Sequence, residues 1–462
     1  MNRPPSPPAP ERSSMPIDFL LERFVARGDA DAIVWHDQAF SYRWLLDRVG
    51  HWRGRIAEMG LPAHANVALV SDFSPNSAAL LLALAGHGCV VLPMVPSISE
   101  SKQGEYLALG ECTWRVRVGA GDEAAFEALG GESRHELFRM LKSAGHPGLV
   151  LFSSGSTGKS KGVVHDFERL MANYLKPRAA LRTVAFLLFD HIGGINTMLH
   201  TLASGGCLIV VDDRSPDGVL EAIARHRAEL LPTSPTFLNL VLLSGAIRRH
   251  DLASLQVIAY ATEPMPETTL ARLRELLPGV RFHQNYGLSE VGILRSKSES
   301  SDSLWVQVGG DGYETRVVDG ILQIKAQSAM LGYLNAPCPF TEDGWFVTGD
   351  LVERKGDFFR FQGRQSELIN VGGEKVYPAE VENVLRTIEN VADAVVYGEK
   401  NPILGNIVCA RVTLVTPEDR AAFTARLKKH CATVLKRHQV PVKVVIAEGP
   451  QHTDRFKKAR FP

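Results

Sequence analysis

The chain has 462 residues, and 51 lysines and arginines balance 51 aspartates and glutamates, so its formal net charge is zero. This balance argues against a dedicated nucleic-acid-binding protein, because neutralising phosphates requires a clear surplus of basic side chains. The most apolar run, residues 78–85, is far shorter than the roughly 20 residues that span a bilayer, so we expect no membrane span. Six scattered cysteines without a CxxC pair are typical of reduced thiols in a cytoplasmic protein.

The regular elements are predicted to begin after a proline-rich N-terminus. Residues 1–14 lack the apolar core of a secretion signal, and we expect them to form a disordered tail. From residue 66, short apolar runs rich in β-branched residues alternate with helical segments of about ten residues. This alternation predicts an α/β fold in which parallel strands are buried between helices. The expected strands are 66–71, 89–92, 207–211, 257–260 and 281–284, and the expected helices are 76–85, 217–226, 236–244 and 267–277.

The pattern changes twice in the last third of the chain. After residue 306, short runs joined by glycine and aspartate turns predict a β-rich subdomain with strands 314–318, 320–325 and 357–361. The final stretch of about 100 residues predicts a small α+β domain. Its expected helices are 378–387 and 417–435, and its expected strands are 391–396 and 408–414. We therefore expect an N-terminal domain over 15–363 and a C-terminal domain over 364–462.

The strongest local signal lies between two strand-like runs, 149–152 and 163–165, where every residue is serine, threonine, glycine or lysine. Glycines let backbone N–H groups converge on an anion, hydroxyls add donors and lysines add charge, so the composition suits a polyphosphate. The loop is not a Walker A motif, because Ser153 stands where that motif requires glycine. The flanking runs favour a hairpin loop, and the alternative is a mobile polar surface loop. The candidate phosphate-binding residues are Ser153, Ser154, Gly155, Ser156, Thr157, Gly158 and Lys159.

Four further segments follow this loop along the chain. They are 286–290 (YGLSE), 345–350 (WFVTGD), 363–382 (which contains GRQSELI and GGEKVYPAEVE) and 453–457 (TDRFK). Together with the loop, in this order, they resemble the adenylate-forming (ANL) superfamily of acyl-CoA synthetases, nonribosomal-peptide adenylation domains and luciferases. The resemblance implies a large N-terminal adenylation domain and a small mobile C-terminal domain that turns about the link at 363–366 between two half-reactions.

The resemblance also implies how the chain would hold ATP. The loop would wrap the β- and γ-phosphates. Tyr286 would stack on adenine, with Thr262 and Glu263 at the edge of the base. Asp350 would grip the ribose hydroxyls with its carboxylate, and Arg364 would contact the same sugar.

The catalytic and metal-binding residues are implied in the same way. Ser289 and Glu290 would hold Mg²⁺, which prefers oxygen ligands. Lys457 would place its ammonium beside the α-phosphate and the attacking carboxylate, where negative charge builds in the transition state, so Lys457→Ala should reduce adenylation by about 10²–10³-fold. His191 would be the aromatic gate between the carboxylate pocket and the ATP site, with a core histidine as the alternative. Asp190 could pair with a substrate amine, as an aspartate does in amino-acid-activating members.

Taken singly, these residues have ordinary structural interpretations. An aspartate after glycine, such as Asp350, commonly stabilises a turn. Glu290 and Arg364 would be solvated charges, and Tyr286 would pack in a core. Lys457 belongs to a basic C-terminal stretch. The ordered set of motifs is what favours the functional interpretation.

Several positions depart from the family pattern. Ser366 stands where the interdomain hinge usually has Asp or Lys, and Phe456 replaces the glycine that commonly precedes the catalytic lysine. A shift of that lysine by one residue, to Lys458, stays open. Thr262 replaces a glycine near adenine, and Ser289 replaces a threonine.

The predicted activity has two half-reactions. With Mg²⁺, ATP would activate an aryl or medium-chain carboxylic acid to an acyl-adenylate, and the acyl group would pass to a thiol, that of coenzyme A. The first alternative is a stand-alone adenylation enzyme that loads an acyl or aminoacyl group onto the phosphopantetheine of a carrier protein. The second is a non-catalytic relative that binds a nucleotide or acyl ligand. Ile192, Gly193, Gly194 and Leu288 predict an apolar pocket suited to a ring.

Overall fold

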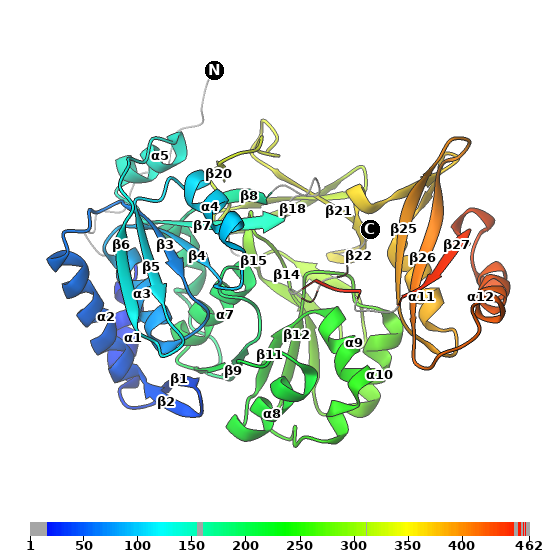
Figure 1. The fold of residues 1–462 in the computed structure, drawn as a ribbon, viewed down its shortest axis with the longest axis horizontal. Helices are drawn as coiled ribbons and strands as arrows, with labels where there is room; N and C mark the ends of the chain where they lie inside the picture. Colours follow the sequence, from blue (N-terminus) through cyan, green and yellow to red (C-terminus); the bar gives the residue numbers. More distant parts are fainter. Residues whose placement is uncertain are drawn as a thin grey trace.

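The computed structural model describes residues 16–154, 160–310, 312–447, 451–453, 456 and 458. Figure 1 shows a first α/β sheet on the left, a second α/β sheet and a β-rich sheet in the middle, and a smaller C-terminal sheet on the right. The predicted fold class is therefore confirmed: large layered α/β sheets, a β-rich part and a small α+β C-terminal domain. Among the described residues, no helix is long and apolar enough to cross a membrane.

The first sheet is buried on both faces. Every residue of β3 (Asn66–Val70) and β4 (Val90–Met94) is buried, as expected for parallel strands covered by helices. Helix α3 (Pro75–Gly86) connects the two strands, and Ser74 and Ser77 cap its N-terminus reciprocally. The strand order is β20-β8-β7-β4-β3-β5-β6. The other elements are β5 (Trp114–Val118), β6 (Ala124–Ala128), β7 (Gly148–Ser154), β8 (Ser160–Asp166), β20 (Gly332–Tyr333), α2 (Tyr42–Glu58), α4 (Glu100–Leu109) and α5 (Glu136–Ala144).

The predicted hairpin around the phosphate loop is confirmed. Strands β7 and β8 are antiparallel, and Ser154 lies opposite Ser160 at the open end of the ladder. The loop residues Gly155, Ser156, Thr157, Gly158 and Lys159 lie outside the described residues. Both ends of the loop are thus fixed side by side by backbone pairing.

The second sheet has the order β13-β12-β11-β9-β10-β1-β2 and is parallel from β13 to β1. The predicted α/β series is therefore divided, with strands near 66–94 in the first sheet and strands near 207–284 in the second. The strands are β1 (Asp31–Trp35), β2 (Gln38–Ser41), β9 (Arg182–Ala185), β10 (Cys207–Val210), β11 (Leu230–Thr233), β12 (Val257–Tyr260) and β13 (Arg281–Gln284). The helices are α1 (Asp18–Arg27), α6 (Phe167–Met171), α7 (Ile192–Ala203), α8 (Pro216–His226), α9 (Pro235–Ser244) and α10 (Glu267–Leu276). Helices α3 and α7 share one apolar core, which joins the two sheets.

The β-rich part is an antiparallel sheet of order β16-β17-β22-β21-β19-β18, preceded by the hairpin β14-β15. Its apolar residues form a separate core that includes Val306, Leu322, Ile324 and Phe359. The strands are β14 (Tyr286–Leu288), β15 (Gly292–Leu294), β16 (Ser296–Ser298), β17 (Val306–Val308), β18 (Tyr313–Val318), β19 (Ile321–Ala326), β21 (Phe346–Lys355) and β22 (Phe358–Arg364).

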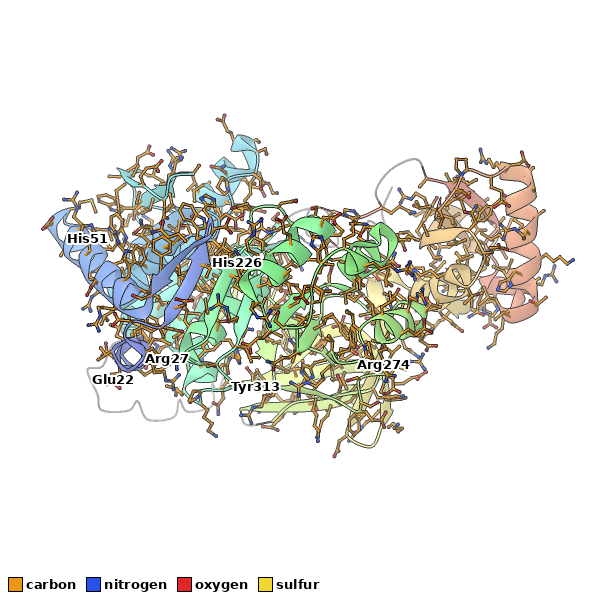
Figure 2. The ribbon with its side chains drawn as sticks, turned by 90° about the horizontal axis from the view of Figure 1, so that it is seen from below. Glu22, Arg27, His51, His226, Arg274 and Tyr313 are labelled. Carbon is orange, nitrogen blue, oxygen red and sulfur yellow. The ribbon has the colours of Figure 1, made fainter. Side chains whose placement is uncertain are left out.

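The C-terminal sheet has its own core, formed by residues such as Val396, Phe423 and Leu427. It contains β23 (Ile369–Val371), β24 (Glu374–Val376), β25 (Val391–Asn401), β26 (Gly405–Leu414) and β27 (Lys443–Ile446), with α11 (Pro378–Arg386) and α12 (Arg420–Val434). The short helices are η1 (Ala172–Tyr174), η2 (Ala246–Arg248), η3 (Gln365–Glu367) and η4 (Arg437–Gln439). Figures 1 and 2 both place this part at one end of the molecule, and η3 connects it to β22.

Candidate active site

A cavity of about 2020 Å³ opens where the two α/β sheets, the β-rich sheet and the end of the chain meet. Its walls come from the hairpin β7-β8, the first turns of α7, the segment after β12, the hairpin β14-β15 and the strands β21 and β22. The predicted residues that line it are Ser153, His191, Thr262, Glu263, Tyr286, Ser289, Glu290, Asp350 and Arg364. The tertiary structure therefore brings together residues that are spread over more than 200 positions of the sequence.

Asp350 is the centre of a buried polar cluster in this cavity. The Tyr286 hydroxyl donates a hydrogen bond to Asp350 Oδ2 at 2.6 Å, and Arg364 Nε lies 3.2 Å from Asp350 Oδ1. The pairing of β21 with β22 places Asp350 directly opposite Arg364. Burial raises the pKa of Asp350, and Arg364 and the Tyr286 hydroxyl oppose this rise. The cluster holds a carboxylate with unused acceptor sites at the cavity wall.

Tyr286 is both a core residue and a cavity residue. Only 7% of it is exposed, and its ring stacks on Phe361 with a centroid distance of 4.5 Å and an interplanar angle of 15°. Burial, together with the neighbouring Asp350 carboxylate, raises the pKa of the Tyr286 hydroxyl well above its ordinary value. The hydroxyl therefore stays protonated as a donor. Phe361 covers one ring face, so a base that stacks on Tyr286 would use the other face.

Glu290 and Ser289 follow β14 in a turn that is fixed from two sides. The Ser289 carbonyl oxygen lies 2.5 Å from His165 Nε2, and the Glu290 carbonyl accepts from the Met330 amide at 2.7 Å. Burial lowers the pKa of His165, so its ring is neutral and carries its proton on Nε2 to meet a carbonyl that only accepts. The Glu290 side chain receives the Tyr333 hydroxyl on Oε1 at 2.7 Å.

Ser289 and Glu290 offer the few protein oxygens that a magnesium ion needs when phosphates and water supply its other ligands. Among the described residues, no group of three or more His, Cys, Asp or Glu side chains could hold a metal ion. Mg²⁺ commonly uses one or two protein oxygens and completes its coordination with phosphates and water. A single carboxylate on the cavity wall, next to a serine, is a donor set of this kind.

Two residues that the sequence reasoning missed, Tyr333 and Asn335, join the phosphate loop to Glu290. Asn335 Nδ2 donates to the Ser160 carbonyl at 2.8 Å, and Asn335 Oδ1 accepts from the Gly162 amide at 3.2 Å. The Lys161 ammonium lies 4.9 Å from the centroid of the Tyr333 ring. The contact partners are more than 170 residues apart in the sequence, so their spacing carries no signal. The segment that contains β20 therefore positions the second arm of the hairpin and the Glu290 carboxylate together.

Thr262 and Glu263 lie between β12 and α10. Thr262 has φ +81°, a left-handed conformation that glycine adopts readily and a β-branched residue does not. This backbone conformation accounts for the glycine that is usual at this position in the adenylate-forming pattern. Glu263 accepts the Thr236 amide on Oε1 at 2.8 Å and the Lys458 amide on Oε2 at 3.3 Å. Its carboxylate thus ties the start of α9 to the end of the chain.

The end of the chain returns to the cavity, which Thr453 and Lys458 line. Lys457 is not among the described residues. Phe456 has φ +49°, its carbonyl accepts from Ser234 Oγ at 2.7 Å, and its ring packs against Phe186 and Phe237. The Lys458 ammonium lies 2.5 Å from Glu382 Oε2, and the Lys458 and Glu382 side chains are only 9% and 2% exposed. Lys458 is among the residues that line the cavity, but its ammonium is held by Glu382 of the C-terminal domain.

His191 begins α7 at the cavity wall. Its Nδ1 accepts the Gly193 amide at 3.1 Å, which caps the helix. Asp190 is buried, and it is absent from the described residues that line the cavity. A Cβ on Gly194 would lie 1.9 Å from the Leu188 carbonyl oxygen, so this glycine is needed for packing and not for pocket shape.

The pocket along α7 is more polar than the sequence suggested. Beyond Ile192 and Gly193, the helix presents Asn196, Thr197 and His200 to the cavity. Apolar residues such as Ile192, Leu288 and Ile293 line the cavity together with these polar groups.

Comparison with known proteins gives consistent matches along the chain. A family model described as AMP-binding enzyme matches residues 21–320, and one described as AMP-binding enzyme C-terminal domain matches residues 380–457. An indoleacetate–CoA ligase of Aromatoleum aromaticum is 27% identical over 65% of this chain, and the match spans 64% of that relative's length. A 2-succinylbenzoate–CoA ligase of Enterococcus faecalis is 24% identical over 96% of this chain and 97% of its own length.

Two further similarities extend over nearly the whole chain. A medium/long-chain-fatty-acid–[acyl-carrier-protein] ligase, FadD10 of Mycobacterium tuberculosis, is 26% identical over 94% of this chain and 91% of its own length. The structure of the amide bond synthetase McbA from Marinactinospora thermotolerans superposes with a TM-score of 0.80 at 21% identity, covering 96% of this chain and 97% of that one. At this identity the structural match establishes the fold.

Proposed function

Because this chain belongs to the AMP-binding enzyme family, we propose that it uses ATP to activate a carboxylic acid and joins the acyl group to the thiol of coenzyme A. In the first half-reaction the carboxylate attacks the α-phosphorus, which forms an acyl-adenylate and releases pyrophosphate. In the second, the thiol attacks the acyl carbon, gives up its proton and expels AMP. The observation that carries this proposal is the convergence of Tyr286, Asp350, Arg364 and Glu290 on one cavity.

The residues around Asp350 are suited to holding the nucleoside. An ionised carboxylate can accept several hydrogen bonds, so Asp350 can receive both ribose hydroxyls while it keeps Tyr286 and Arg364. We propose that adenine stacks on the ring face of Tyr286 opposite Phe361, with Thr262 and Glu263 at its edge. The hairpin holds the two ends of the loop, Ser154 and Ser160, side by side, and we propose that the loop between them binds the phosphates.

We propose that Glu290 and Ser289 hold a magnesium ion. That ion would supply positive charge to the phosphates when bound. Within the protein, Tyr333 holds one oxygen of Glu290 in place. His165 donates its Nε2 proton to the Ser289 carbonyl oxygen, which fixes the backbone of this turn.

We assign the transition-state cation to Lys457. The buried ion pair of Lys458 with Glu382 supports this choice over a shift by one residue. Lys457→Ala should reduce adenylation by about 10²–10³-fold, comparable to the loss of one oxyanion donor. Lys458→Met is the matched control. It should lower the stability of the protein without the 10²–10³-fold loss in the adenylation rate.

The two domains, 15–363 and 364–462, are proposed to turn against one another between the half-reactions. The separate C-terminal core and the single connection through η3 support a pivot at Gly363–Ser366. His191 is proposed to separate the carboxylate pocket from the nucleotide, since it lines the cavity at the start of α7.

The test is ATP–pyrophosphate exchange with Mg²⁺ across fatty, aryl and amino acids, followed by AMP release with and without coenzyme A. Exchange with one class of acid, together with AMP release that coenzyme A stimulates, is the expected result. At subsaturating ATP, exchange should fall by about 10-fold in Asp350→Asn, which removes the charge that the nucleoside site provides. Absence of exchange with every acid would overturn the proposed activity.

A carrier-protein acceptor is the second candidate. The acyl-carrier-protein ligase FadD10 is 26% identical over 94% of this chain, a similarity no lower than that of the coenzyme A ligases over comparable lengths. This candidate would be favoured if exchange proceeds, coenzyme A does not stimulate AMP release, and phosphopantetheinylated carrier protein does.

A further inference from the structure

Charged side chains are distributed unevenly around the cavity. The acidic residues that line it, Glu263, Glu290, Asp350 and Glu367, all belong to the proposed nucleotide site or the adjoining link. The remaining lining includes basic residues of α6, β13 and β16 and of the segments between η1 and β9 and between β15 and β16: Arg169, Arg281, Lys297, Lys176, Arg178 and Arg295. We call the part of the cavity around His200, Arg178 and His283 the distal end.

Helix α7 connects the gate to the distal end. Gly193, Asn196, Thr197 and His200 are spaced three or four residues apart, so they share one face of the helix, and all four line the cavity. His191 at the start of the helix and His200 near its end are nine residues apart, which corresponds to about 13 Å along the axis. An acid whose activated carboxylate lies beside His191 can therefore extend along this face to His200.

Arg178 supplies positive charge at the distal end. It is exposed there, and no hydrogen bond or ion pair joins its guanidinium to another of the described residues. Burial and the neighbouring Arg295 lower the pKa of Arg178, and only the hydroxyls of Tyr313 and Tyr174 oppose this effect. No carboxylate in the described part of the chain balances this guanidinium.

Two histidines that face Arg178 are kept neutral. Burial and the field of Arg178 lower the pKa of His200 to about 4. Burial lowers the pKa of His283 in the same direction, with Arg281 and Arg178 adding to the effect. A neutral imidazole can donate one hydrogen bond without a requirement for a counter-charge.

The hydroxyl groups around Arg178 are already fixed by the protein. Tyr174 donates to Asn196 Oδ1 at 3.1 Å, and Tyr313 donates to Asn173 Oδ1 at 2.9 Å. Figure 2 labels Tyr313 where the β-rich part meets the green α/β part, and Tyr313 lines the cavity. His283 Nε2 lies 3.5 Å from Ser296 Oγ, so the Arg178 guanidinium is the charged group at the distal end that is left to meet a ligand.

We propose that the distal end binds a second carboxylate of the acid substrate, with Arg178 as the residue that recognises its charge. This inference rests on the proposed acid activation and names its substrate class: dicarboxylic acids whose two carboxylates are separated by roughly 10 Å, a little less than the His191–His200 rise. A monocarboxylic acid of the same length would leave the positive end uncompensated. Arg178 is therefore a specificity-determining residue of the acid pocket.

The experiment compares suberate with octanoate and sebacate with decanoate in ATP–pyrophosphate exchange without coenzyme A. In the unaltered enzyme the diacid should have a KM about 10-fold lower than the matched monoacid, because the monoacid lacks the charged contact. Arg178→Gln should abolish this difference by raising the diacid KM, with kcat unchanged, and Arg178→Lys should restore part of it. Arg248→Gln is the matched control, since Arg248 is an exposed arginine that does not line the cavity.

Three outcomes would overturn the inference. One is a preference for monoacids, and another is an equal effect of Arg178→Gln on both members of a pair. The third is an effect of Arg178→Gln that is absent from exchange and appears only in the KM of coenzyme A when AMP release is assayed with it, which would assign the positive end to the coenzyme's phosphates.

A binding measurement distinguishes failure of the proposed acid activation from failure of the inference about the distal end. If no acid supports exchange, the acid activation fails, and thermal unfolding with suberate or octanoate then tests the distal end directly. Stabilisation by suberate that is lost in Arg178→Gln would retain the anion site. Equal shifts with both acids would reject it.

Discussion

Asp350 shows, at the scale of single residues, how a binding site opposes stability. Its side chain is almost buried, and burial raises its pKa in the folded protein. Because the folded pKa lies above the unfolded value of about 3.9, the contribution of Asp350 to the free energy of unfolding falls as pH rises through that window. At neutral pH the ionised carboxylate is therefore a destabilising group that ATP binding would use.

Asp350→Asn should accordingly separate stability from nucleotide binding. Without ATP, the variant should unfold at the same temperature as the parent or higher at pH 7.5, because Tyr286 can still donate to the amide oxygen and Arg364 is half exposed. The apparent affinity for Mg·ATP, measured from the thermal stabilisation that it causes, should fall by about 10-fold. Thermal unfolding with and without Mg·ATP measures both effects.

Asp343→Asn is the control for this prediction. Asp343 is exposed, pairs with Arg316 and lies outside the cavity lining, and the Arg316 hydrogen bond lowers its pKa to about 2. Its substitution should leave the response to Mg·ATP unchanged. A clear loss of stability in Asp350→Asn without ATP would contradict the account of Asp350.

Tyr333 provides a second prediction at this scale. Tyr333→Phe removes the hydroxyl that donates to Glu290 but keeps the ring beneath the Lys161 ammonium. The Glu290 carboxylate would then be free to rotate, so we expect the Mg²⁺ concentration for half-maximal exchange to rise by about three- to tenfold, as for the loss of a charged hydrogen bond. A magnesium titration of exchange is the measurement. Tyr397→Phe on β25 should show no change, and an unchanged magnesium response in Tyr333→Phe would reject a positioning role.

At the scale of elements, α11 is anchored by a buried ion pair. Glu382 on this helix accepts the Val396 amide at 3.0 Å and pairs with the Lys458 ammonium, which also donates to the Ala394 carbonyl at 3.1 Å. The pair joins α11 and β25 to the end of the chain. Removing one charge would leave the other nearly buried and uncompensated.

Glu382→Gln should therefore destabilise the C-terminal domain by about 3 kcal/mol. The matched variant on the same helix is Glu380→Gln, which removes a charge at an exposed position but keeps an oxygen that can accept from Gln439, so it should cost less than about 1 kcal/mol. Hydrogen–deuterium exchange of the β25 amides reports the difference. Equal protection in the two variants would show that the ion pair contributes little.

At the scale of the whole molecule, the end of the chain joins the two domains. Ser234 caps α9 by accepting the Phe237 amide and donates its hydroxyl to the Phe456 carbonyl. The Phe456 ring lies 5.1 Å from Phe186 and 5.3 Å from Phe237. In this arrangement the segment next to Lys457 is docked on the N-terminal domain, whereas the Lys458 side chain is held by the C-terminal domain.

Phe456→Ala should weaken this docking by about 2 kcal/mol through loss of the aromatic contacts. We expect adenylation to fall, while transfer from a supplied acyl-adenylate to coenzyme A is unaffected, because the second half-reaction would use a turned C-terminal domain. Separate assays of the two half-reactions measure this split. Leu404→Ala, at an exposed site of the C-terminal domain, is the control. An equal loss in both half-reactions would contradict the docking role of Phe456.

The sequence by itself determined the features that depend on neighbouring residues. The alternation of apolar runs and helices, the β-rich change after residue 306 and the hairpin at 148–166 are local patterns, and the structure confirms them. The motif residues could be named for the same reason, since each motif is a short run. Their roles stay proposals, but their convergence on one cavity agrees with the resemblance.

Only the tertiary structure decided which distant residues meet. The division of the α/β series into two sheets, the contact of Asn335 with the loop hairpin, and the hydrogen bond from Tyr333 to Glu290 join residues that no local pattern relates. The burial of the Lys458 ammonium and the gathering of Arg178, Arg281 and Arg295 at the cavity likewise arise from packing. The physical reason is that hydrogen bonding, burial and electrostatic fields act through space, so their effects follow the folded positions of the residues and not their order in the chain.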